Sequence, residues 1–174
     1  MFDDEDDDFL ENNLNEDLEQ FESHLNGNLI GFLDSDRLEA VIDHYIINGQ
    51  YPKALSAADF GVYHFPYNFV FNLRKAQAMS GMGLLNDALE LLNTIEKANA
   101  PNTEIFLTKA ALFSQIRDPK NAIRYFRLAI EICDPEDKDD IYMDIALEYQ
   151  NMSQFKEAIE ILIEAIKINS QNEG

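Results

Sequence analysis

Apolar residues recur along the chain at the spacing of amphipathic helices. Leu14, Leu18, Phe21 and Leu25 follow one another at intervals of three or four residues, and Gly27 comes after them. Residues at this spacing share one face of an α-helix, and glycine is common just past a helix end. The pattern predicts a short N-terminal amphipathic helix and a connector over residues 14–34.

A longer period begins at residue 35. Four alanines, 34, 34 and 36 residues apart, hold the same place in four similar segments: Ala54, Ala88, Ala122 and Ala158. Upstream of each alanine lie a turn and, before it, the bulky end of a helix-like stretch: Tyr45, Met79, Phe113 and Tyr149. A small residue lets two helices cross closely. The period therefore predicts an array over 35–174 of four helical hairpins, at about 35–68, 69–102, 103–138 and 139–172.

Two helix starts can be predicted from capping residues. Asp118 precedes Pro119, which is the order of an N-cap followed by proline in the first turn. Asp36 and Glu39 have the spacing of a capping box. We expect helices to begin at these two places.

The four segments resemble tetratricopeptide repeats. The last segment carries the family's large and small positions at Tyr142, Ile145, Ala146, Tyr149, Phe155, Ala158, Leu162 and Ala165. The first segment carries them at Leu38, Tyr45, Gly49, Tyr51, Ala54, Gly61 and Pro66. The middle segments depart from the pattern at Lys75 and Lys109, where an apolar residue is usual. The resemblance implies an all-α fold, a right-handed α-solenoid of four hairpins behind the N-terminal helix. The N-terminal part also looks like repeat proteins of the Bacteroidetes, which implies a bacterial protein.

The charge of the chain is strongly acidic. Thirty-three Asp and Glu stand against 13 Lys and Arg, for a net charge of -20, and the acids crowd the N-terminus. Such a chain repels phosphate, so nucleic acid and anionic membranes are excluded as partners. The run of acids from Asp3 to Asp8 opposes packing, and we predict a disordered acidic tail over residues 1–13.

Catalytic motifs are lacking in the sequence. His24, His44 and His64 are 20 residues apart, which puts them on different elements, and Cys133 has no second cysteine to pair with. We expect no enzyme activity, no catalytic residues, no metal and no cofactor. No export signal or apolar span is evident, which favours the cytoplasm.

The predicted binding surface is the concave face, which one side of each first helix would line. Its middle is apolar, and its ends are acidic, with Asp36 projecting onto the face at one end and Asp140 at the other. The residues that we assign to this groove are Glu39, Asp43, Leu73, Arg74, Gln77, Leu107, Thr108, Ala111, Met143, Asp144 and Leu147. Such a surface suits a basic and apolar peptide or an amphipathic helix of another protein.

The leading hypothesis is a scaffold or adaptor that holds a partner in this groove. One alternative is a small acidic chaperone similar to those of type III secretion translocators, and another is a non-catalytic regulatory fragment of a larger protein. The last helix is apolar and lacks a polar capping helix after it. We predict that the chain either is truncated or buries this helix by self-association as a homo-oligomer.

Overall fold

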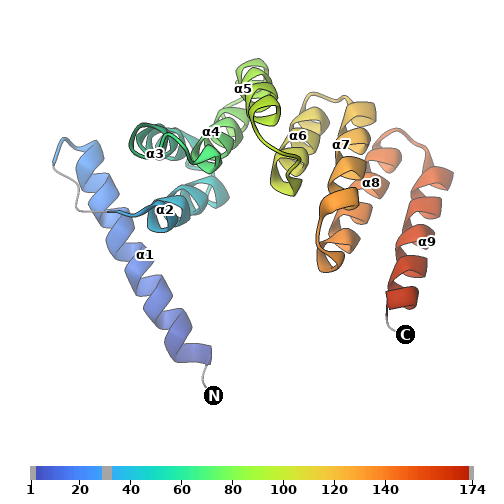
Figure 1. Cartoon of the computed structure of the whole chain (residues 1–174), viewed down its shortest axis with the longest axis horizontal. Coiled ribbons are helices and arrows are strands. Elements are labelled where there is room, and N and C mark those ends of the chain that lie inside the picture. The colour runs from blue at the N-terminus through green and yellow to red at the C-terminus, as the bar shows by residue number, and fades with distance from the viewer. Residues whose placement is uncertain (1–2, 29–32, 173–174) are drawn as a thin grey trace. The chain divides into compact units, whose positions relative to one another are not determined.

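The computed structural model describes residues 3–28 and 33–172, with side chains over 13–28 and 33–168, and these residues form helices and no strand (Figure 1). The helices are α1 (Asp3–Leu25), α2 (Ser35–Ile47), α3 (Tyr51–His64), α4 (Phe69–Gly81), α5 (Leu85–Ala98), α6 (Thr103–Gln115), α7 (Pro119–Ile132), the 3-10 helix η1 (Pro135–Asp137), α8 (Lys138–Asn151) and α9 (Phe155–Asn172). The all-α repeat fold predicted from the period is confirmed.

The N-terminal helix is longer than the sequence pattern suggested. We predicted disorder through residue 13 and a helix from Leu14, whereas α1 begins at Asp3.

The first compact unit extends to Ala88 and contains α1 to α4. Within it α1 packs on α2, α2 on α3, and α3 on α4. Phe21 of α1 is fully buried and its ring lies 6.4 Å from that of Tyr45 and 6.0 Å from that of Phe60. The helix α1 therefore covers the apolar side of the first hairpin.

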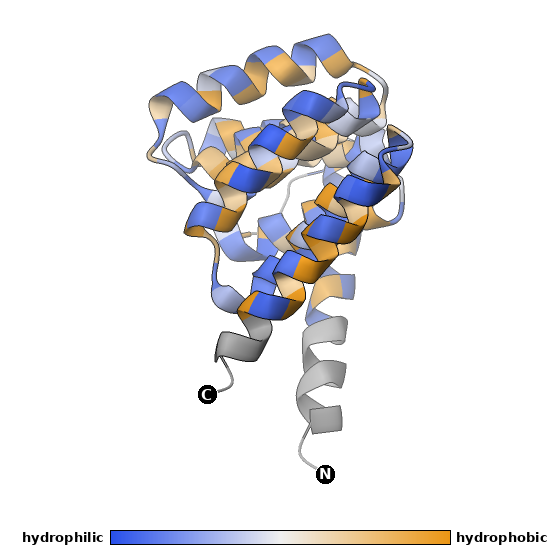
Figure 2. Ribbon diagram, turned by 90° about the vertical axis from the view of Figure 1, so that its right-hand side faces the viewer, coloured by the Kyte–Doolittle hydropathy of each residue, from blue (hydrophilic) through white to orange (hydrophobic). Residues whose placement is uncertain are grey.

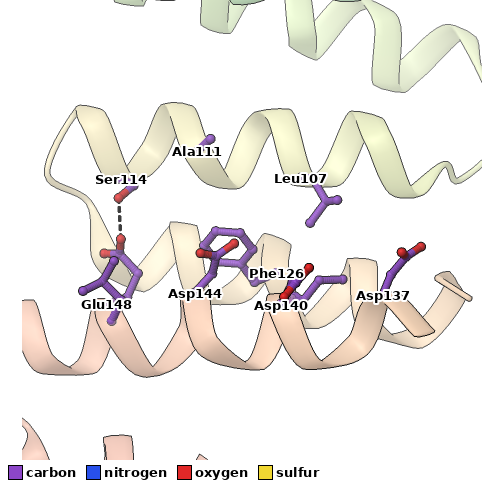
Figure 3. Close-up of a pocket in the computed structure, with 10 residues that line it drawn as sticks. Leu107, Ala111, Ser114, Phe126, Asp137, Asp140, Asp144 and Glu148 are labelled. Carbon is purple, nitrogen blue, oxygen red and sulfur yellow. Dashed lines mark hydrogen bonds between the residues drawn. The ribbon is translucent and has the colours of Figure 1, made fainter. Parts of the chain in front are cut away.

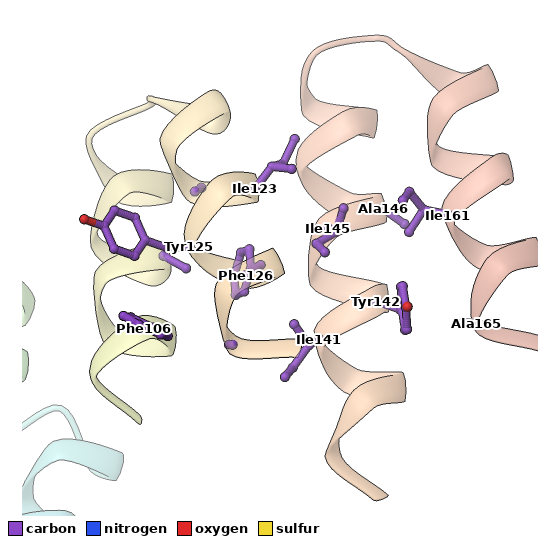
Figure 4. Packing of buried hydrophobic residues seen from close by; sticks show 13 residues of the cluster. Phe106, Ile123, Tyr125, Phe126, Ile141, Tyr142, Ile145, Ala146, Ile161 and Ala165 are labelled. Atoms are coloured by element: carbon purple, nitrogen blue, oxygen red, sulfur yellow. The ribbon is translucent and has the colours of Figure 1, made fainter. Parts of the chain in front are cut away.

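The second compact unit begins at Leu89, inside α5, and contains α6 to α9. Each of these helices packs on the next, and their apolar faces enclose one core (Figure 4). Phe126 of α7 and Ile141 and Ile145 of α8 lie in this core, with Ile161 from α9. The units thus have separate cores, each built from hairpins.

The hairpin alanines are buried where the period places them. Ala54, Ala88 and Ala122 have no exposed surface, and Ala158 is partly buried against the second core. Close helix contacts also depend on glycine. A Cβ on Gly61 would lie 2.3 Å from the ring of Phe71.

All four hairpin turns share one backbone motif. The amide three residues past the end of each first helix donates to the carbonyl five residues earlier, with N–O distances of 2.7 to 2.9 Å. The acceptors are the bulky residues of the period, Tyr45, Met79, Phe113 and Tyr149. This is the Schellman arrangement, which needs one residue with positive φ. The residues with positive φ are Gly49, Gly83, Arg117 and Ser153, at the same place in each turn.

The helix caps agree with one prediction and correct the other. Asp118 caps α7 by accepting a hydrogen bond of 3.2 Å from the amide of Asn121, as predicted. The cap of α2 is Asp34, which accepts from the amide of Arg37 at 2.9 Å, so the capping box predicted at Asp36 and Glu39 is wrong. Asp36 instead lies inside the first turn.

Candidate functional site

A pocket of about 530 Å³ lies between α6 and α8 in the second unit (Figure 3). Both helices pack on α7, which supplies the floor through Phe126. The lining residues are Leu107, Ala111, Ser114, Phe126, Asp137, Asp140, Ile141, Asp144, Leu147 and Glu148. The α6 side of the pocket is largely apolar, and the α8 side carries the charge.

The α8 side is a row of carboxylates. Asp137, at the start of the helix, is followed by Asp140, Asp144 and Glu148 at spacings of three and four residues, which place them on one helix face. Among the described residues that line the pocket there is no Lys or Arg. The pocket is therefore strongly negative beside an apolar wall.

The environment of Asp144 reflects this crowding. Desolvation raises the pKa of its carboxyl above the ordinary value, and the charges of Asp140 and Glu148 raise it further. The ionised form of Asp144 is thus disfavoured in this site, and a cation placed beside it would relieve the repulsion.

Glu148 is held at the inner end of the pocket. Its side chain is buried, and the hydroxyl of Ser114 donates a hydrogen bond to its carboxylate (Figure 3). The two residues come from α8 and α6, so this bond links the two walls. A buried carboxylate needs such a partner because an unsatisfied charge is costly.

The pocket contains four of the predicted groove residues: Leu107, Ala111, Asp144 and Leu147. Leu147 is 52% exposed. Thr108 of α6 and Met143 of α8 do not line it, although Met143 is exposed. The sequence assignment missed Glu148, yet its spacing of four residues from Asp144 signals the shared face. Phe126 had no such signal, because it belongs to the second helix of its hairpin.

In the first unit the predicted residues form an ion-pair cluster. The Arg74 guanidinium on α4 lies 2.8 Å from a carboxylate oxygen of Glu39 and 2.6 Å from one of Asp43, both on α2. Arg74 is largely buried on α4, and its contacts with α2 join the two helices and offset part of the negative charge predicted there. Gln77 is half-buried on the same helix.

Leu73 requires a correction. It was assigned to the partner-binding surface, but its side chain has no exposed area. A side chain without exposed area makes no contact with a partner. The helical projection gave its direction and not its burial.

Over the part of the chain that the structure describes, no three His, Cys, Asp or Glu are grouped so as to hold a metal ion. Among the same residues, no helix has the length and hydropathy of a membrane span. Burial raises the pKa of the half-buried Cys133 thiol.

Comparison with known proteins identifies the fold of this chain. Residues 139–172, which form α8 and α9, match the tetratricopeptide repeat family model. The fold is that of tetratricopeptide repeat proteins. A thermophilic repeat protein of this type from Thermus thermophilus superposes with a TM-score of 0.69 at 20% identity, over 86% of this chain and 80% of that one. MamA from Desulfovibrio magneticus RS-1 gives a TM-score of 0.63 at 16% identity, over 81% and 78% of the chains. No curated protein matched the sequence.

Proposed function

We propose that this tetratricopeptide repeat chain is a non-catalytic scaffold that binds a protein segment in the pocket between α6 and α8. The segment carries Lys or Arg beside apolar side chains. The observation that carries the proposal is a pocket with four carboxylates, an apolar wall and no basic residue among the described ones that line it. Proteins with this fold generally bind other proteins and lack catalysis.

The two walls favour different parts of such a segment. On α8, Asp140 and Asp144 attract a cation, and the raised pKa of Asp144 supports this preference because a nearby cation would lower that pKa. On α6, Leu107 and Ala111 offer apolar surface, and Leu147 extends it from α8. An amphipathic segment matches both walls at once, because it presents its charged and apolar residues on different sides.

Two model peptides of equal length test the charge preference. One alternates Leu with Lys and the other Leu with Glu, and fluorescence anisotropy measures their binding to the full chain. We expect only the Lys peptide to bind, with an affinity that falls as salt screens the carboxylates. Equal binding of both peptides, or none of the Lys peptide, would contradict the proposal.

Paired variants separate the pocket from the overall charge. Asp140→Asn with Asp144→Asn removes two pocket carboxylates, and we expect at least about tenfold weaker binding of the Lys peptide. Glu131→Gln with Glu160→Gln removes the same charge from exposed positions outside the pocket. If this control weakened binding as much, the pocket would not be the site.

A second pair of variants tests the natural partner. Leu107→Glu with Leu147→Glu should abolish the capture of proteins that crosslink to the wild-type pocket, as identified by mass spectrometry. Ile132→Glu, at an exposed apolar position on α7, serves as the control. An unchanged partner set in the double variant would count against the pocket.

A further inference from the structure

The last helix exposes an apolar stripe. Between 41% and 68% of the surface of each of its five large residues is accessible: Phe155, Ile159, Leu162, Ile163 and Ile166. On the face that packs into the second core, Ile161 and Ala165 are buried. Figure 2 shows apolar positions as orange bands along the helix that leads to the C-terminus. The helix α9 is thus apolar on two faces, and one of them is open.

The open face is unlike the equivalent faces of the first and third hairpins. The second helix α3 is covered by α4, and the second helix α7 by α8. At the N-terminal side of the first hairpin, α1 covers α2 and buries Phe21 completely. The stripe on α9 corresponds to surfaces that another helix covers in the first and third hairpins.

The spacing of the stripe suits pairing with one more helix. Phe155, Ile159, Leu162 and Ile166 follow at intervals of four, three and four residues, which is the heptad spacing of a helix-helix seam. Ile159 and Ile166 hold the first apolar position of the heptad, and Phe155 and Leu162 hold the second. A β-branched residue at the first position with leucine at the second favours two-helix pairing.

The charges of α9 fit a second copy of this chain. Its described side chains include two Lys and three Glu, so the helix is nearly neutral in a chain of net charge -20. Two copies therefore meet little repulsion along this face. A strongly basic partner would gain more from the acidic pocket on α8 than from this helix.

The area is sufficient for a pair. Five side chains of this size and exposure, counted on both copies, amount to roughly 1,000 Å² when they are fully covered, which is about the minimum area of a biological interface. Most of that surface is apolar, and the burial of apolar surface is the dominant favourable term in most association.

We propose that two copies of the chain associate through α9 about a two-fold axis. The helix α9 of each copy covers the apolar stripe of the other. Since α9 already packs on α8, the two hairpins form a four-helix bundle at the interface. The peptide pocket between α6 and α8 lies on other residues, so this interface does not depend on the proposed function.

Light scattering across a concentration series tests the pairing. We expect the wild-type chain to have twice its mass of 20.0 kDa and to dissociate on dilution. Ile159→Glu with Ile166→Glu should raise the dissociation constant by about a hundredfold or more, because the pair would bury unmatched charges. Both positions are exposed, so circular dichroism should show unchanged helix content. Ile47→Glu, at an 83% exposed position on α2, should leave the dimer intact.

Charge complementation distinguishes α9 pairing from other arrangements. Ile159→Lys with Ile166→Lys should likewise be monomeric alone, but a mixture with the glutamate variant should restore a dimer containing one copy of each. This result is expected for parallel or antiparallel helices, because both positions carry the same charge. A monomeric wild-type chain, a dimer that survives the glutamate variant, or a mixture that stays monomeric would overturn the proposal.

Discussion

Arg117 and Ser153 have positive φ angles of 63° and 60°, which L-residues other than glycine rarely adopt. They hold the places that Gly49 and Gly83 hold in the first two turns. The left-handed conformation costs a residue with a Cβ roughly 1 to 2 kcal/mol. Glycine avoids this cost but loses more backbone entropy on folding. We therefore expect Arg117→Gly to stabilise the chain by a net amount of about 1 kcal/mol, as measured by urea unfolding.

The reverse substitution is the matched control for that turn. Gly83 has φ of 79° in the equivalent turn, with no atom near an added Cβ. Gly83→Ser should therefore destabilise through the backbone alone. If neither Arg117→Gly nor Gly83→Ser changed the free energy of unfolding, the positive φ at this place in the turn would cost a residue with a Cβ nothing.

Lys109 is a charged residue at a position where the repeat pattern has an apolar one. It is almost fully buried, and its ammonium group donates to Asn93 at 2.7 Å, to the Tyr125 hydroxyl at 2.8 Å and to the Glu96 carboxylate. Lys109→Met keeps most of the volume but removes these bonds, and we expect a loss of about 2 kcal/mol in thermal or urea unfolding.

Glu96 offers a test of the origin of that loss. The Glu96 side chain is partly exposed, and in the Lys109→Met variant its carboxylate no longer has a cation to form an ion pair with. Adding Glu96→Gln to Lys109→Met should recover part of the stability, because the unmatched charge is gone. A fully stable Lys109→Met variant would show that the network adds no net stability.

Asp144 predicts a dependence of stability on pH. Its pKa is raised in the folded chain, so the ionised carboxylate opposes folding above that pKa, and the penalty disappears as the pH falls through it. We expect Asp144→Asn to raise the melting temperature at pH 7, with a gain that vanishes at about pH 4, near the pKa of an unperturbed carboxyl. An equal gain at both values would exclude charge repulsion as the cause.

Helix contacts in the first unit depend on Gly61 at the crossing of α3 and α4. An added Cβ would meet the Phe71 ring at 2.3 Å, and Phe71 is itself fully buried. Alanine has the higher helix propensity by about 1 kcal/mol, but overpacking costs about 1 to 3 kcal/mol. We expect Gly61→Ala to be destabilising in urea unfolding. Gly61→Ala with Phe71→Leu should be less destabilised than the sum of the two single variants.

The elements of this fold could be predicted because each hairpin repeats a steric requirement. Ala54 and Ala122 are fully buried as the period requires, and Asp118 caps its helix. The turn conformation at Arg117 and Ser153 could not be predicted from the residues themselves, since neither is a glycine. It follows only from their place in the period.

The site could be predicted less well than the elements. A helical projection gives the direction of a side chain, and Asp144 and Leu147, which it placed on one face, both line the pocket. It does not show what covers that side chain, and Leu73 was misassigned for this reason. Likewise, the ion pairs of Arg74 join two helices and depend on tertiary packing.

At the scale of the whole molecule, the described residues form a hydrophobic core within each compact unit. Residues of α1 to α4 form the first core, and residues of α6 to α9 form the second. In repeat proteins each element contacts its sequence neighbours, so stability is a sum of local terms and need not be uniform along the chain. A substitution in one core is therefore expected to act mainly on that core.

Hydrogen exchange measured by mass spectrometry tests this independence in the full chain. Gly61→Ala should increase amide exchange in α2 to α4 and leave α6 to α8 near the wild-type rate. Ala122→Trp overpacks a fully buried position in the second core and should produce the opposite pattern. Both variants act by overpacking, so a difference between their amide exchange patterns reflects where the strain is placed and not what kind of strain it is. Equal loss of protection in both units by either variant would show that the two cores unfold as one cooperative structure.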